Sequence, residues 1–140
     1  LAIRTARDGW PSADGMELQI LDGPHATKDG MAAIYRNVPP IAVAHESEQW
    51  NQLIVKAEGR MISAWINGQL VQQVNTAWES ELQHRRLEGW IGLQDHGARI
   101  EVRHLRVSES PEGLGQTAKG HGVPLRSGSS VEYRTAFARR

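Results

Sequence analysis

Residues 50–74, WNQLIVKAEGRMISAWINGQLVQQV, decide the fold. Three segments rich in apolar residues are separated by two short turns, Glu58-Gly59 and Asn67-Gly68. Both residues of an Asn-Gly pair tolerate a positive φ, so this dipeptide between β-rich segments is a strong hairpin signal. The stretch therefore predicts three consecutive antiparallel strands. We expect Trp50 and Trp65, together with the Val and Ile side chains, to form the core.

Shorter strands are predicted on the N-terminal side of this meander. Residues 1–4 have the pattern of a strand, and residues 16–20 alternate strictly between apolar and polar side chains. This alternation places Glu17 and Gln19 on one face and the apolar side chains on the other. Residues 31–35 predict a further short strand.

A second pair of strands is predicted near residue 95. Residues 89–97, GWIGLQDHG, predict a strand that ends in a tight polar turn, and residues 99–107 predict the strand that returns beside it. The end of the first strand presents an amide, a carboxylate and an imidazole in succession, at Gln94, Asp95 and His96. A hairpin turn requires only Asp or Asn with Gly, so the other two groups are additional. The residues alone favour equally a functional site and a polar turn whose Asp caps its own backbone.

Composition argues against several classes of function. The chain has 140 residues, with 16 basic and 16 acidic side chains, and no basic stripe favours nucleic acid. It contains no cysteine, so disulfides, thiolate nucleophiles and thiolate zinc sites are excluded. No apolar run reaches the length of a membrane span. The zinc-protease HExxH, P-loop and dinucleotide-binding motifs are also missing from the sequence.

The composition changes after residue 107. Gly, Ser, Pro, Lys and Arg dominate residues 108–140, which predicts a low-complexity, flexible and irregular tail. Residues 1–107 form the predicted domain, and their short strands separated by turns predict an all-β antiparallel sandwich of the jelly-roll type. Because the first residue, Leu1, lies inside a predicted strand, we expect the chain to begin within a longer protein.

Other side chains carry weaker functional signals. The polar face that carries Glu17 is simply solvated in most antiparallel strands, so a functional role is the less common outcome. Arg4 ends a strand and precedes a loop, where a guanidinium can reach a carbohydrate or a carboxylate. The rings of Trp10 and Trp78 can stack on sugars; so can that of Trp90, although we expect it in the core.

Four motifs in this order resemble the 3-keto-disaccharide (3-keto-glycoside) hydrolase family. They are ELQILD at residues 17–22, WNQLIV at 50–55, WING at 65–68 and GWIGLQDHG at 89–97. The first four residues, LAIR, also resemble the family strand that ends in an arginine. The resemblance covers about three quarters of the chain and implies a concanavalin A-like or laminin-G-like jelly roll. Two departures are visible: no residues here correspond to the family's first strands, so we expect the domain to be partial, and the tail matches no part of the family.

The resemblance implies a hydrolase that cleaves glycosides whose C3 hydroxyl has been oxidised to a ketone. It implies His96 as a base or acid, with Asp95 as its orienting or metal-coordinating partner. Glu17 is implied as a second acid or base, or as a metal ligand. The other implied site residues would bind sugar hydroxyls or the enolate oxygen: Arg4, Gln19 and Gln94.

The resemblance fixes no cofactor, although a divalent metal ion would suit two carboxylates and a histidine as an enolate stabiliser. A carbohydrate is the expected ligand. A partner chain or an oligomer is expected to complete a sandwich that lacks strands, and an extracytoplasmic location, periplasmic or secreted, is favoured. Two alternatives stay open. One is a non-catalytic carbohydrate-binding module, because jelly rolls of this type host both functions; the other is a subunit or fragment of a larger assembly.

Overall fold

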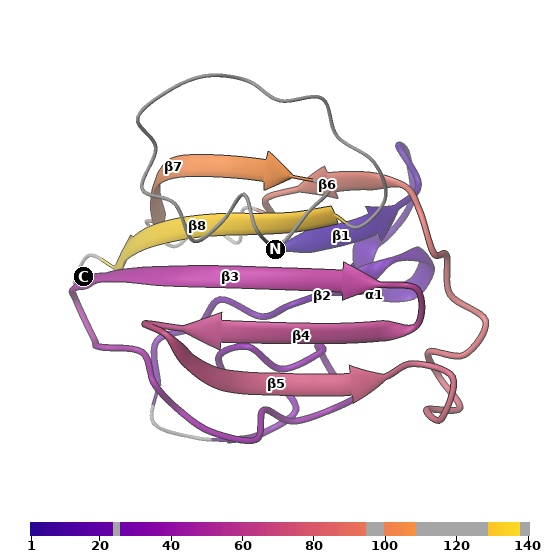
Figure 1. The fold of residues 1–140 in the computed structure, drawn as a ribbon, viewed down its shortest axis with the longest axis horizontal. Helices are drawn as coiled ribbons and strands as arrows, with labels where there is room; N and C mark the ends of the chain where they lie inside the picture. Colours follow the sequence, from indigo (N-terminus) through magenta and orange to yellow (C-terminus); the bar gives the residue numbers. More distant parts are fainter. Residues whose placement is uncertain (24–25, 95–99, 109–128, 138–140) are drawn as a thin grey trace.

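A computed structural model describes residues 1–23, 26–94, 100–108 and 129–137 of the protein. One sheet, called the small sheet below, contains β1 (Ala2–Thr5), β2 (Met16–Glu17) and β6 (Trp90–Gly92) in the order β2-β1-β6. The large sheet has the order β5-β4-β3-β8-β7, and its strands are β3 (Trp50–Glu58), β4 (Met61–Ile66), β5 (Gln69–Asn75), β7 (Ile100–Ser108) and β8 (Ser129–Phe137). The strand pairs are antiparallel, and one short helix, α1 (Pro11–Asp14), is present in the described part of the chain (Figure 1). The prediction of an all-β antiparallel sandwich is confirmed.

The meander predicted from residues 50–74 is β3-β4-β5. The β3–β4 register runs from Leu53 opposite Ile66 to Glu58 opposite Met61. The turn between β4 and β5 has Asn67 at φ 51° and Gly68 at φ 83°, so both positions use the positive φ that Asn-Gly permits.

The core lies between the two sheets. Residues Leu53, Val55 and Ala57 of β3 alternate with more exposed neighbours and point toward the small sheet. The small sheet and its flanks contribute other buried side chains to the same cluster: Leu1, Ile3, Met16 and Leu18. Met16 and Leu18 therefore occupy the apolar face that the alternation of residues 16–20 predicts.

The expectation that Trp50 and Trp65 belong to the core is wrong. Trp50 is 38% exposed, and the guanidinium of Arg103 lies 3.8 Å from the centroid of its ring. Trp65 is half-buried and lies opposite Ile54. Both tryptophans occupy the strand positions that point away from the small sheet, where long apolar surfaces are only partly covered.

The predicted hairpin between residues 89–94 and 99–107 is not formed in the described residues. β6 pairs with β1 in the small sheet, whereas β7 pairs with β8 in the large sheet. The two strands therefore belong to different layers, as successive strands in two-layer β folds often do. Each strand then pairs with a neighbour that is distant in the sequence.

The segment expected to be an irregular tail contains β8. This strand pairs with β3 on one side and with β7 on the other, from Trp50 opposite Ala136 to Ala57 opposite Ser129 on the β3 side. The sequence 131–137, VEYRTAF, starts with an apolar–polar alternation that the surrounding Gly and Ser residues obscure. The strand joins β7 to the large sheet (Figure 1).

Two connecting segments lie outside the regular strands, and a strand was predicted for the first of them. Residues 31–35 form no regular strand, because Ala32 takes a φ of 63°, and only an isolated bridge joins Ile34 to Leu18. Residues 76–88 form turns, with Leu82 fully buried. Arg85 links these turns to α1, since its guanidinium donates hydrogen bonds to the carbonyl oxygens of Ser12 and Gly15, the latter at 2.8 Å.

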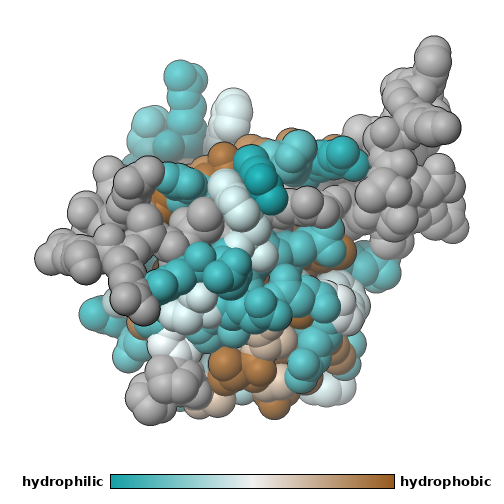
Figure 2. Space-filling view, turned by 90° about the vertical axis from the view of Figure 1, so that its left-hand side faces the viewer, coloured by the Kyte–Doolittle hydropathy of each residue, from teal (hydrophilic) through white to brown (hydrophobic). Residues whose placement is uncertain are grey.

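The described surface is largely polar where Figure 2 displays it. On the side at the left of Figure 1, hydrophilic residues dominate and the hydrophobic ones gather in small patches (Figure 2). In the described part of the chain, no helix is both long enough and apolar enough to cross a membrane.

Candidate functional site

A row of three residues crosses the outer face of the small sheet. Ala2 on β1 is paired with Glu17 on β2 and with Gly92 on β6. Directly opposed residues of antiparallel strands point to the same face. The next pair, Ile3 with Met16, is part of the core, so the row Glu17–Ala2–Gly92 faces away from the large sheet.

Glu17 is only 5% exposed, although it lies on this outer face. Its negative charge raises the pKa of the Leu1 amino group, but burial lowers that pKa more strongly, to about 6. The carboxylate of Glu17 is therefore close to the start of β1 in a poorly solvated position.

The two predicted glutamines flank this row. Gln94 follows Gly92 by two residues, and its side-chain Oε1 is buried without a donor among the described residues. Gln19 follows Glu17 by two residues, is half-buried, and accepts a hydrogen bond from the backbone of Ile20 at 3.2 Å. A buried acceptor without a donor costs free energy. A ligand hydroxyl that donated a hydrogen bond to Gln94 Oε1 would remove this cost.

A groove of about 600 Å³ opens beside the row. Its floor contains Ala2 and Gly92, and it extends along β1 to Thr5. Two indole rings line it, those of Trp10 and Trp90, which are 69% and 60% exposed. Its volume falls within the roughly 300–1,000 Å³ typical of small-molecule sites.

The expectation that Trp90 lies in the core is wrong. Trp90 is paired with Thr5, and both residues line the groove on the outer face. The guanidinium of Arg7 lies 6.0 Å from the centroid of the Trp90 ring, at the outer limit of a cation–π contact. The exposed ring is therefore held beside a cation and remains accessible to a ligand.

A bulge in β1 turns Arg4 to the opposite face. Ala2 and Thr5, three residues apart, pair with Gly92 and Trp90, which are two residues apart. The extra residue is accommodated by Arg4, whose φ is 54°. A bulge of this kind changes the side to which a strand residue points.

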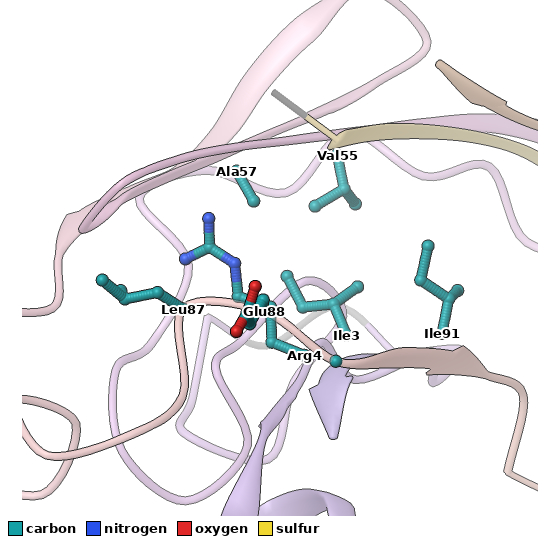
Figure 3. A pocket seen from close by; sticks show the side chains of 8 residues that line it. Ile3, Arg4, Val55, Ala57, Leu87, Glu88 and Ile91 are labelled. Atoms are coloured by element: carbon teal, nitrogen blue, oxygen red, sulfur yellow. The ribbon is translucent and has the colours of Figure 1, made fainter. Parts of the chain in front are cut away.

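The guanidinium of Arg4 lies between the two layers. It donates a hydrogen bond of 2.6 Å to the carbonyl oxygen of Gly59, in the β3–β4 turn. Figure 3 shows it rising from β1 beside a cavity of about 140 Å³ that Ile3 and Ala57 also line. Burial lowers the pKa of Arg4 from its ordinary value, and the nearby charge of Arg60 lowers it further. Arg4 thus lines this cavity and is not among the residues that line the groove.

A family model described as the 3-keto-alpha-glucoside-1,2-lyase-like domain matches residues 1–108. The chain belongs to this family. The resemblance inferred from the four sequence motifs is thereby confirmed, and the matched range contains the small sheet and its polar row. Membership indicates a glycoside-cleaving domain that acts on carbohydrate. No curated protein and no solved structure was found to match the chain.

Two of the residues expected to be catalytic in this lyase-like domain, Asp95 and His96, lie outside the described residues. Gln94, which directly precedes them, is described and lines the groove. Of the ligands expected for a divalent metal, only Glu17 is described, and no group of three or more His, Asp or Glu side chains in the described part of the chain is arranged to hold an ion. The described residues therefore do not form a metal site.

Sequence reasoning missed part of the groove wall of the lyase-like domain. Thr5 and Arg7 line the groove but carry no motif. The available signal is the run RDGWP at residues 7–11, in which a turn sequence precedes an aromatic residue. The turn predicts a loop, but only the structure shows that this loop lies against β6.

Proposed function

We propose that this lyase-like domain hydrolyses 3-keto-glycosides, including 3-keto-disaccharides, at the outer face of the small sheet. The observation that carries the proposal is the row Glu17–Ala2–Gly92, with Gln94 beside it at the edge of a groove. The row combines a carboxylate with two residues that have little or no side chain. A sugar ring can therefore approach the sheet closely while its polar groups meet the carboxylate and the amide.

The chemistry starts from the acidity that a C3 ketone confers on the C2 proton. A base removes this proton, and the C–H electron pair forms an enolate. The enolate then collapses to a C1=C2 double bond as the C1–O bond breaks, and the leaving oxygen takes a proton. Water next adds across the double bond, with its hydroxyl on C1 and a proton on C2, which gives the free 3-keto sugar.

This sequence requires a base near C2, a donor to the enolate oxygen and an acid at the leaving oxygen. It does not require the paired carboxylates that flank the bond in ordinary glycosidases. A single buried carboxylate such as Glu17 is compatible with it.

The residue roles follow from chemistry and from the family resemblance. Glu17 is assigned as an acid or base, and His96 as the second one, with Asp95 orienting the imidazole. The amide of Gln94 donates to the enolate oxygen, while its Oε1, which has no donor among the described residues, accepts from a sugar hydroxyl. Gln19 binds a further hydroxyl. Arg4, whose guanidinium is bonded to Gly59 between the layers, is assigned no role in these steps.

A second candidate function is a non-catalytic carbohydrate-binding module. The observation that favours it is the pair of exposed rings, Trp10 and Trp90, in one groove. Exposed aromatic rings with a few polar groups are sufficient for binding, and no base is needed. The two functions differ in whether the glycosidic bond of a bound 3-keto sugar is cleaved.

The test is incubation of the full chain with a 3-keto-disaccharide, with and without a chelator, followed by chromatography of the released sugars. Release of the second sugar from the 3-keto substrate, but not from the unoxidised disaccharide, is expected. In heavy water the 3-keto product should carry deuterium at C2, because the proton added there comes from solvent. Binding without release supports the module instead.

Matched variants assign the roles. Glu17→Gln removes the charge without changing the shape, and we expect kcat to fall by about 100-fold. Glu58→Gln is the control, since Glu58 is exposed and pairs with Lys56 at 2.8 Å. His96→Ala should abolish turnover. Near-normal turnover in Glu17→Gln and in His96→Ala would contradict the proposed roles.

A further inference from the structure

The groove extends along β1 and β6, from Ala2 and Gly92 to Thr5 and Trp90. Trp90 precedes Gly92 by two residues on β6, which separates the two positions by about 7 Å at the usual rise of a strand. This distance is on the scale of one pyranose ring. A ring held over the row Glu17–Ala2–Gly92 therefore leaves room for a second ring beside Trp90.

The two ends of the groove differ in chemistry. The end near the row is lined by Ala2, Gly92 and the amide of Gln94, and Glu17 lies next to this end as the strand partner of Ala2. The residues that line the groove at the other end are aromatic, small or cationic, and none of the described ones is a carboxylate or a histidine: Thr5, Ala6, Arg7, Gly9, Trp10, Pro11 and Trp90. This end can bind a sugar but has no group that would exchange protons with it near neutral pH.

We infer that the end of the groove lined by Trp10 and Trp90 is the subsite for the leaving group, and that it selects a second sugar ring over a small leaving group. The inference rests on the proposed function, because it needs the 3-keto ring to lie over the row. The C–H groups on one face of a pyranose ring are apolar and carry partial positive charge, which suits the negative face of an indole. Arg7 beside Trp90 can donate hydrogen bonds to the hydroxyls at the ring edge.

The Trp10 wall of the groove is held in place before any ligand binds. The backbone N–H of Trp10 donates to Asp14 Oδ2 at 2.7 Å. Gly9 leaves no space for a side chain, because an added Cβ would lie 2.5 Å from the same oxygen. Arg85 holds the end of α1 by its hydrogen bond to Gly15. A prearranged wall reduces the entropy lost when a ring binds.

The test compares two substrates of the full chain, a 3-keto-disaccharide and the corresponding methyl 3-keto-glucoside. Trp90→Ala and Trp10→Ala should each lower the ratio of the two kcat/KM values, disaccharide over methyl glycoside, by about tenfold. Trp90→Phe keeps an aromatic face and should retain most of the ratio. Trp78→Ala is the matched control, since Trp78 is 83% exposed and lies outside the groove. Its ratio should stay at the wild-type value.

The outcomes separate this inference from the proposed function. Cleavage with an unchanged ratio in both Trp10→Ala and Trp90→Ala overturns the leaving-group subsite and leaves the reaction standing. If no substrate is cleaved, calorimetric binding of the unoxidised disaccharide decides the matter. Weaker binding in both variants than in Trp78→Ala supports a sugar-ring subsite while the proposed reaction fails. Equal binding in all three, or none, overturns the subsite as well.

The folding of each variant is checked by its thermal unfolding midpoint. Trp10 lies in a loop, whereas Trp90 lies in a strand. Trp10→Ala therefore carries the test if Trp90→Ala does not fold.

Discussion

Arg4 and Glu17 lie on opposite faces of the small sheet. Glu17 is paired with Ala2 on the outer face, whereas the guanidinium of Arg4 reaches between the layers to the carbonyl oxygen of Gly59. The two side chains that the family resemblance assigns to one site are therefore separated by the backbone of β1. Arg4 connects the small sheet to the β3–β4 turn, and Glu17 lies on the outer face, where we propose that the substrate binds.

Replacing Arg4 by Lys tests this division. The ammonium group of lysine cannot reproduce the geometry of the guanidinium, so the carbonyl oxygen of Gly59 loses the hydrogen bond from Arg4. We expect the free energy of unfolding to fall by about 1–3 kcal/mol, as measured by urea denaturation. KM for a 3-keto-glycoside should change little. Unchanged stability together with a raised KM would show instead that Arg4 contacts the substrate.

Gly89 is the point at which β6 approaches the bulge of β1. Its φ is 149°, and a Cβ added there would lie 2.5 Å from the carbonyl oxygen of Thr5. Gly89→Ala should therefore lower the free energy of unfolding by about 1–3 kcal/mol. Gly23→Ala is the control, because its Cβ meets no atom within 4 Å, and it should unfold like the wild type. A Gly89→Ala variant as stable as the wild type would show that the start of β6 is not packed this closely against Thr5 of β1.

Gly92 tests the groove without disturbing the core. Its added Cβ would meet no atom within 4 Å, so Gly92→Val is tolerated by the strand and favoured by β propensity. The valine side chain would project into the groove between Ala2 and Gln94. We expect unchanged or slightly higher stability but a loss of kcat/KM of about tenfold or more. Full turnover in a folded Gly92→Val variant would place the substrate elsewhere.

How much of the fold could be predicted depends on how far apart in the sequence the residues that decide each strand pairing lie. The meander β3-β4-β5 was predictable because its turns are short and local, with Asn67-Gly68 fixing the register of β4 and β5. The partners of β6 and β7 were not, because each strand chooses between neighbours far apart in the sequence. The same limitation hid β8, whose pattern is short and surrounded by Gly and Ser.

The candidate site likewise combines local features that could be predicted with long-range ones that could not. Alternation alone predicted that Glu17 points away from Met16 and Leu18, and the register confirms this face. The inward turn of Arg4 depends on a positive φ that no local residue pattern predicts. For Trp90, alternation defines two faces but does not say which one is covered, and a large aromatic residue is by default assigned to the core.

The two walls of the groove have different structural origins. The polar row is built on paired strands, whereas the Trp10 wall belongs to the loop that Arg85 fastens to the turns after β5. Loops accept substitution and insertion more readily than the sheets that support them. If the proposed subsite holds, leaving-group preference can therefore diverge through the segment before Gly15 while the proposed reaction on the paired strands is kept. The same separation offers a route to retarget the enzyme, by grafting new sequences into that loop rather than redesigning the sheet.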